Sequence, residues 1–286
     1  MALGERFTLR PSAIAGAWYP GSAPALRRAV EEYLGQASRA ELPGELLALV
    51  SPHAGYAYSG PTAGHAFAQV RGAAFERVIL LGPLHRPIRG SAVGSFMVPA
   101  EDAYSTPLGD VPLDRAFIAR LGAEVELTPV RRDEEHALEI ELPFLQVALG
   151  SFALVPMMLG DYIGTRGTVE RLERLAHALA ALWEPGTLIV VSTDLSHLDD
   201  YADVVRTDRR LLDLVQAFDV AGLIAALARE QVQACGASGL VAAFRAAQQL
   251  GATAARVLHY TNSGDVTGRR AAGVYTVGYM AAAVCR

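Results

Sequence analysis

The sequence predicts an α/β fold: a single domain with a mixed, largely parallel central sheet flanked by helices. Apolar runs at residues 46–50, 77–81 and 187–191 lack alternation, which is typical of strands buried on both faces of a parallel sheet. A chain of 286 residues is long enough for one large α/β domain with a sizeable core. No linker, repeat or composition shift divides it, so we expect one domain over residues 1–286.

Helices are predicted where apolar residues recur at helical spacing between capping and breaking residues. Ser22 has the side chain of an N-cap, and Pro24 suits the first turn of the helix that follows. Asp133 is placed to cap a long helix, in which Pro143 predicts a kink or a restart. The predicted helices cover residues 25–34, 61–70, 133–149, 169–183, 201–218, 220–229 and 239–250.

Strands are predicted in the apolar runs between these helices. Pro156 weakens one candidate strand, because proline cannot donate a ladder hydrogen bond. Residues 98–112 show no clear period, which predicts an irregular connection. The predicted strands cover residues 46–50, 77–81, 154–159, 187–191, 255–261 and 273–280.

Composition and charge argue against several classes of function. The chain contains no lysine, its net charge is −5 and its pI is about 5.8. Without a basic patch we expect no nucleic acid partner. No apolar run approaches the roughly 18 residues that a membrane span requires, and residues 1–10 lack the apolar core of a signal peptide. Cys235 and Cys285 do not make a disulfide framework. We therefore expect a cytoplasmic protein without membrane partners.

Three of the apolar strands are each followed by a loop that carries a histidine: His53, His85 and His197 in chain order. In an open α/β sheet, ligands bind outside the carboxyl ends of the strands, so these histidines predict one convergent site. His53 and His85 lie in Gly- and Pro-rich loops, where binding and catalytic groups concentrate. We favour a functional role for both. The remaining histidines within predicted helices or strands are interpreted as structural: His65, His177 and His259.

Asp194 precedes His197 by three residues, beyond the third of these strands. His197 has the chemistry of a general base or a ligand, and Asp194 could orient it or hold a bound water. The alternative for Asp194 is the N-cap of a short helix. Sequence leaves both interpretations open.

Two other candidates have ordinary structural explanations that spacing alone favours. His136 and Glu139 share one helix face, but a solvated acidic first turn is the commoner explanation. Cys235 precedes a predicted helix, whose N-terminus would lower the pKa of its thiol. The alternative is a small buried residue in a tight turn, which is slightly favoured.

Convergence of His53 and His85 with one anionic group would make a transition-metal site. Two imidazoles and a carboxylate form the ligand set of non-haem Fe(II) enzymes. A thiolate in place of the carboxylate also suits copper electron-transfer sites and catalytic zinc.

Taken in order, short motifs along almost the whole chain resemble those of the Memo family, which includes the microbial AmmeMemoRadiSam system protein B. Each motif is short, but the ordered set is highly specific. The motifs are AGAWYP at 15–20, PHAGY at 52–56, LGPLH at 81–85, EH at 135–136 with Glu139 and LPF at 142–144, STDLSH at 192–197, CG at 235–236 and YTNSGD at 260–265.

The resemblance implies a fold similar to class III extradiol ring-cleaving dioxygenases, which use non-haem iron. His53, His85 and Cys235 would then be the metal ligands, with the thiolate in place of the dioxygenase glutamate. The expected metal is iron, with copper and zinc as alternatives. The resemblance thus reverses the interpretation of Cys235 as a buried structural residue.

The resemblance also assigns expected roles within the pocket. His197 would match the acid/base histidine of the dioxygenases, with Asp194 and His136 beside it as catalytic candidates. An aromatic wall for the substrate would come from Trp18, Tyr56 and Tyr58.

Two main functions follow from these expectations. The first is a metal-dependent oxidoreductase, and the second is a non-catalytic protein that binds a small molecule or peptide in the same cleft. A metal-assisted hydrolase, active with zinc and without dioxygen, is a third. The family's association with a radical SAM protein and an AMMECR-type protein suggests these as pathway partners.

Overall fold

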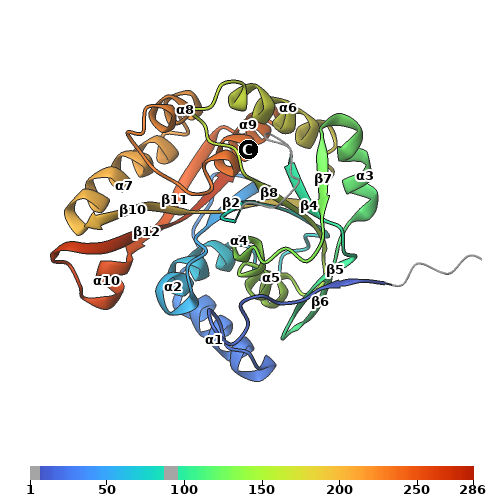
Figure 1. Ribbon diagram of the computed structural model, residues 1–286, viewed down its shortest axis with the longest axis horizontal. Coiled ribbons are helices and arrows are strands. Elements are labelled where there is room, and N and C mark those ends of the chain that lie inside the picture. The colour runs from blue at the N-terminus through green and yellow to red at the C-terminus, as the bar shows by residue number, and fades with distance from the viewer. Residues whose placement is uncertain (1–6, 87–95) are drawn as a thin grey trace, which may run out of the picture.

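The computed structural model describes residues 7–86 and 96–286, and Figure 1 shows them as a large mixed sheet flanked by helices. The predicted α/β class with a single domain is therefore confirmed, and the arrangement is consistent with an extradiol dioxygenase-like fold. The prediction that the chain has no signal peptide concerned residues 1–10, of which residues 1–6 lie outside the described ranges.

The main sheet has four parallel strands at its centre, in the spatial order β2, β9, β3 and β8. Antiparallel strands continue it on both sides, with β12 beside β2 and β4 beside β8. β10 and β11 pair with β12, and β7 pairs with β4 at the other edge. The strands are β2 (Leu46–Ser51), β3 (Arg77–Pro83), β4 (Phe96–Pro99), β7 (Leu127–Val130), β8 (Ala153–Leu159), β9 (Thr187–Ser192), β10 (Asp194–Asp200), β11 (Ala254–Asn262) and β12 (Ala272–Cys285).

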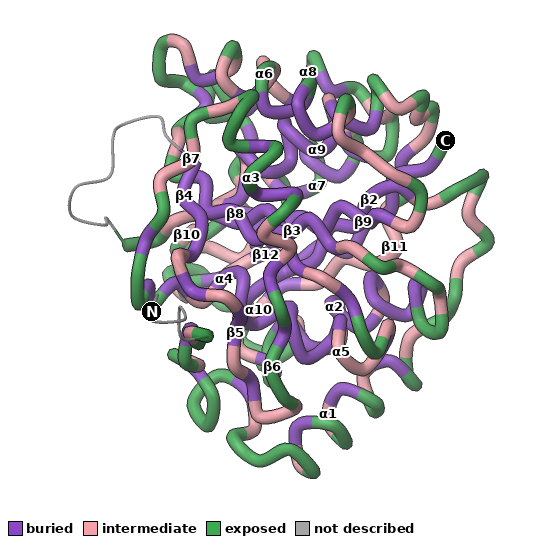
Figure 2. The backbone as a smooth tube through the Cα atoms, turned by 90° about the vertical axis from the view of Figure 1, so that its right-hand side faces the viewer, coloured by how far each residue is buried: buried purple, intermediate pink, exposed green. Residues whose placement is uncertain are grey.

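The central strands are apolar throughout because helices cover both faces of the sheet. α9 contacts β2, β3 and β9 on one face, with α6 outside it. α2 contacts β2 and β12 on the other face, with α1 and α5 outside it. The buried stretches in Figure 2 accordingly follow the central strands and the helices packed on them.

The helices match most of the predicted segments, with shifted ends. α2 begins five residues earlier than predicted, because Tyr56 is buried with its ring centroid 5.0 Å from that of Phe144. Ser22 precedes α1 as expected, although its side chain makes no capping hydrogen bond. The helices are α1 (Ala23–Gln36), α2 (Tyr56–Phe67), the 3₁₀ turn η1 (Ala68–Val70), α3 (Arg115–Glu124), α4 (His136–Glu139), α5 (Leu142–Leu149), α6 (Thr168–Ala181), α7 (Tyr201–Gln216), α8 (Val220–Ala228), α9 (Ala237–Gln249) and α10 (Ser263–Thr267).

The predicted helix over residues 133–149 is two helices. α4 begins at His136 with Glu135 as its N-cap, so the expectation that Asp133 caps it is wrong. The chain restarts in α5, where Pro143 lies in the first turn as predicted. The side chain of Asp133 instead accepts hydrogen bonds from Arg10, a contact across more than a hundred residues.

The prediction of an irregular connection over residues 98–112 is wrong. It contains β5 (Ala103–Thr106) and β6 (Gly109–Pro112), which form a small separate sheet with β1 (Leu9–Arg10). Strands of four residues or fewer are too short to show a period, and β1 joins β5 from the distant N-terminal segment.

Two further details of the sheet bear on the predictions. Pro156 lies inside β8, where β4 pairs only with Met158 and Leu159, so the missing N–H interrupts no bond to β4. Asp194 begins β10 and caps no helix, which excludes the N-cap alternative. Among the described helices, none is long and apolar enough to cross a membrane.

Candidate functional site

The loops of His53 and His85 reach one edge of the sheet with Asp194, because β2, β3 and β9 are adjacent and parallel. His197 lies in strand β10, paired with β12, and not in the predicted loop. β9 lies between β2 and β3, so Asp194 falls between His53 and His85 at the carboxyl ends. His53, His85, Asp194 and His197 line one pocket of about 530 Å³, which we call the histidine pocket. The structure therefore brings together the histidines that follow the three strands.

A fourth histidine completes a compact group in this pocket. Ligand atoms of His53, His85 and His136 all lie within 4.8 Å of one another, and we call these residues the histidine cluster. The ring centroids of His85 and His136 are 4.5 Å apart, and that of His53 is 5.1 Å from His85. His136 enters from the first residue of α4, which packs against β3.

Hydrogen bonds at Nδ1 orient the imidazole of His53. Its Nδ1 lies 2.8 Å from Ser192 Oγ, and Ser192 donates its own proton to the carbonyl of Ala137 over 2.6 Å. Ser192 Oγ therefore accepts from Nδ1–H, which leaves a lone pair on Nε2. The backbone N–H of His53 donates to Asp194 Oδ1 over 2.8 Å, so Ser192 at the end of β9 and Asp194 at the start of β10 together set the position of this ring.

A carboxylate orients His85 in the same way. Its Nδ1 donates to Glu135 Oε1 over 2.9 Å, and its backbone N–H donates to Oε2 over 2.6 Å. Burial favours the neutral acid, but these bonds and those from the α4 backbone outweigh it and lower the pKa of Glu135 to about 2. An ionised carboxylate only accepts, so the neutral imidazole of His85 carries its proton on Nδ1 and its lone pair on Nε2.

The third ring, that of His136, lies beside Trp18, with ring centroids 4.3 Å apart. Burial, reinforced by the neighbouring His85, lowers the pKa of His136 to about 4 despite the opposing charge of Glu135. The imidazole is therefore neutral at pH 7, as metal ligation requires.

The short helix α4 is held by a buried ionic network. Arg10 is completely buried, and its guanidinium donates to Asp133 Oδ1, to the carbonyl of Glu135 and to the carboxylate of Glu139. Glu139 also accepts from the hydroxyl of Tyr19 over 2.7 Å. The N-terminal segment thus fixes the helix that carries His136.

Cys235 reaches the cluster from the loop before α9. Its Sγ lies 3.1 Å from Nε2 of His53 and accepts the backbone N–H of Asp194 over 3.2 Å. Gly236 allows this approach, because a Cβ there would lie 2.5 Å from the carbonyl oxygen of Ser192.

The expected lowering of the Cys235 pKa is not found. Burial, with the nearby Asp194 carboxylate, raises the pKa of the thiol above its ordinary value. Hydrogen bonds from the backbone of Asp194 and Gly236, and from the side chain of Thr193, favour the thiolate but do not offset the loss of hydration. A bound cation would act in the opposite direction on this thiol.

The remaining predicted residues divide between the pocket and the core. Trp18 and Tyr58 line the histidine pocket, and Tyr275, which sequence reasoning missed, lines it as well. Tyr56 is buried with its hydroxyl donating to the carbonyl of Ile140, and it is not among the described lining residues.

Sequence reasoning also missed the groups behind the histidines. Glu135 and Ser192 were recognised only as parts of motifs, although each lies beside a strand end or a candidate histidine. Glu141 approaches Ser192 Oγ to 2.9 Å, and burial raises its pKa to about 8. Proximity to a strand end or to a candidate histidine is the sequence signal that could have identified these groups. Arg10 offered no such signal, because its partners are distant in sequence.

Comparison with known proteins bears out the resemblance. Residues 10–283 match the family model described as Memo-like protein. A MEMO1 family protein of Methanopyrus kandleri is 34% identical, over 91% of this chain and 94% of that protein. Others from Thermotoga maritima, 32% identical over 96% and 98% of the two chains, and Aeropyrum pernix, 33% identical over 96% and 99%, are similar along nearly their whole length.

Proposed function

Since this chain belongs to the Memo-like family, we propose that it is a metal-dependent oxidoreductase whose metal is bound in the histidine pocket. The observation that carries this proposal is the orientation of His53 and His85. Both rings give Nδ1–H to oxygens of the protein and keep Nε2 for a ligand. This hydrogen bonding is usual for metal-binding histidines.

Two sets of three ligands contain these imidazoles. One adds His136, which completes the histidine cluster, and the other adds Cys235, whose Sγ lies close to His53. We propose the set with Cys235, because a thiolate would offset the charge of the cation in a buried site. His136 then lies at the pocket wall with Trp18 against it.

The proposed metal is iron, with copper or zinc as alternatives that imidazole and thiolate also suit. A redox-active ion would supply open coordination positions and accept or release electrons. Substrate binding and proton transfer are assigned to side chains of the protein. Trp18, Tyr58 and Tyr275 would hold the substrate, and His197, Asp194 and His136 are the candidates for moving a proton.

Metal binding is the first test of this proposal. Protein that is purified anaerobically and carries no metal-chelating tag is expected to contain about one metal ion per chain. Inductively coupled plasma mass spectrometry measures this content. His53→Ala and His85→Ala should each lose it, and Cys235→Ser should weaken Fe(II) binding at least about tenfold. His177→Ala is the matched control, because that exposed imidazole contacts only Gln249 among the described polar partners.

The outcomes separate the ligand sets. Retention of metal in His136→Ala and weakening in Cys235→Ser support the proposed set, and the reverse pattern assigns His136 instead. A parent protein that binds no iron, copper or zinc after anaerobic reconstitution would contradict the metalloenzyme.

A non-catalytic ligand-binding function is the second candidate. It is favoured by three aromatic side chains of the histidine pocket that are exposed: Trp18 at 39%, Tyr58 at 45% and Tyr275 at 59%. Exposed aromatic groups around a cleft are typical of surfaces that bind a small molecule or peptide. Ligand binding by metal-free protein, abolished in Trp18→Ala, would favour this function.

We also propose a cytoplasmic location and a pathway shared with radical SAM and AMMECR-type proteins. The location rests on the apolar and cysteine patterns of the sequence, and the pathway rests on the family resemblance. Fractionation of cells and co-purification with a tagged copy of this chain test them directly.

A further inference from the structure

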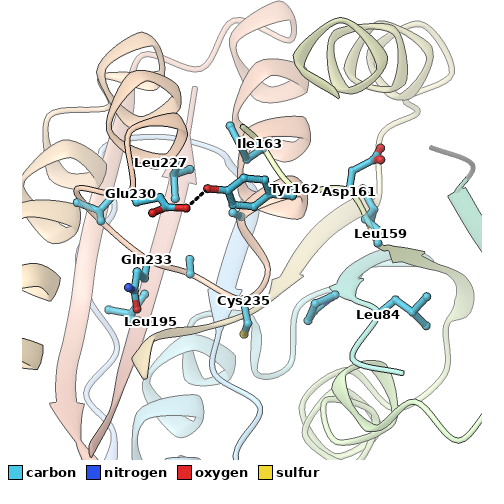
Figure 3. A pocket seen from close by; sticks show the side chains of 15 residues that line it. Leu84, Leu159, Asp161, Tyr162, Ile163, Leu195, Leu227, Glu230, Gln233 and Cys235 are labelled. Carbon is cyan, nitrogen blue, oxygen red and sulfur yellow. Dashed lines mark hydrogen bonds between the residues drawn. The ribbon is translucent and has the colours of Figure 1, made fainter. Parts of the chain in front are cut away.

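A second cavity is lined by Cys235, whose Sγ lies 3.1 Å from Nε2 of His53 in the histidine pocket. It measures about 390 Å³, within the size range of small-molecule sites. Figure 3 shows Cys235 at one end of it and a hydrogen bond between Tyr162 and Glu230 at the other. Of the residues that line the histidine pocket, none lines this cavity.

The walls of the second cavity are mainly apolar side chains from β8, β10, α8 and the loops around them. This lining suits the hydrocarbon part of a ligand, whose burial is favourable by about 25 cal/mol per Å². The main apolar contributors are Leu84, Leu159, Ile163, Leu195, Leu227 and Val232.

The charged groups of the cavity are all of one sign. Among the lining residues that the structure describes, the charged ones are Asp161 and Glu230, and none is basic. Asp161 is neutralised by Arg171 at 2.7 Å. Glu230 has no cationic partner among the described residues, and its carboxylate accepts only the hydroxyl of Tyr162, over 2.5 Å. One carboxylate at the rim is thus available to a cation.

We propose that the second cavity binds a small organic molecule with an apolar body and an ammonium group. The body lies among the leucines, and the ammonium pairs with Glu230. The same geometry disfavours an anion, whose charge would face that carboxylate without a basic side chain to offset it. This inference does not rest on the proposed metal site.

The test uses full-length, metal-free protein with a chelator present, so that an amine cannot be bound by a metal. Binding of 2-phenylethylamine at pH 7.5 is measured by calorimetry and ligand-observed NMR, with 3-phenylpropionate as the anionic analogue. We expect the amine to bind at least about tenfold more tightly, which corresponds to about 1.4 kcal/mol.

Substitutions locate the site. Glu230→Gln should remove most of the preference for the amine, and Tyr162→Phe should retain it, because the ring stays and the carboxylate is released. Glu124→Gln is the matched control, since this exposed carboxylate at the end of α3 lines neither cavity. Trp18→Ala, in the histidine pocket, should leave the amine affinity unchanged.

Several results would overturn the proposal. Equal affinity for the amine and the carboxylate, or no binding of either at 10 mM amine (roughly the weakest affinity of interest), excludes an ammonium site. An unchanged preference in Glu230→Gln, with folding verified by thermal unfolding, excludes Glu230. Loss of amine binding in Trp18→Ala would place the amine in the histidine pocket instead.

Discussion

Two places in this molecule bring histidine rings together, and among the described residues only one of them gathers three imidazoles. His85 and His136 have ring centroids 4.5 Å apart, and His65 and His259, on α2 and β11, are 4.3 Å apart. Both pairs are stacked, with planes 20° apart in the first and 3° apart in the second, but among the described residues only the first is joined by a third ligand atom within 4.8 Å, from His53. Ring proximity alone therefore does not identify a metal site.

The surroundings of the two groups explain the difference. Ser192 and Glu135 hold the Nδ1 atoms of His53 and His85, and a buried arginine fixes the helix behind them. In the stacked pair, the described side-chain contact is between His259 Nδ1 and Thr62 Oγ1 at 3.0 Å. A third imidazole within reach, a carboxylate behind one ring and a rigid frame distinguish the histidine cluster from the stacked pair.

The largest effect is expected at the buried arginine. Arg10→Met leaves Asp133 and Glu139 without their cation, so the free energy of unfolding should fall by about 3–5 kcal/mol. Urea denaturation measures it. Arg120→Met, which breaks an exposed pair with Glu184, is the control and should cost less than about 1 kcal/mol. Similar losses of unfolding free energy in the two variants would show that the buried network of Arg10 contributes no more to stability than an exposed ion pair.

The next effect concerns the acceptor behind His85. Glu135→Gln keeps the shape of the side chain but removes the charge, and should weaken metal binding by about 10–100-fold. Titration of metal-free protein with Fe(II) or Zn(II) gives the affinity. Glu134→Gln, an adjacent exposed carboxylate paired with Arg86, should leave it unchanged. Equal affinities in both variants would contradict the orienting role of Glu135.

The smallest effect is expected at the stacked pair. Burial, reinforced by the neighbouring His65, lowers the pKa of His259 to about 4. Between about pH 6.5 and that value the unfolded chain binds a proton that the folded protein does not, so stability falls as the pH falls through this window. His259→Gln should remove this part of the pH dependence, which amounts to less than one proton. The free energy of unfolding is measured from pH 7.5 to 4.5. If it changes with pH in His259→Gln as steeply as in the parent protein, the pH dependence does not come from His259.

Local patterns were sufficient where neighbouring residues decide the structure. The apolar strands at 46–50, 77–81 and 187–191 were correctly predicted, and the rule that ligands bind at the carboxyl ends led to His53 and His85. The prediction for residues 98–112 was wrong because strands of four residues are too short to show a period.

The sequence by itself determined the fold class, the family and the sheet edge at which polar groups gather, because apolar runs and ordered motifs are local properties. Only the tertiary structure decided which side chains meet there. Arg10 joins Glu139, and Cys235 joins His53, across more than a hundred residues in each case. The raised pKa of Cys235 is likewise a property of its burial, since loss of hydration depends on every segment packed around the thiol and not on its neighbours in sequence.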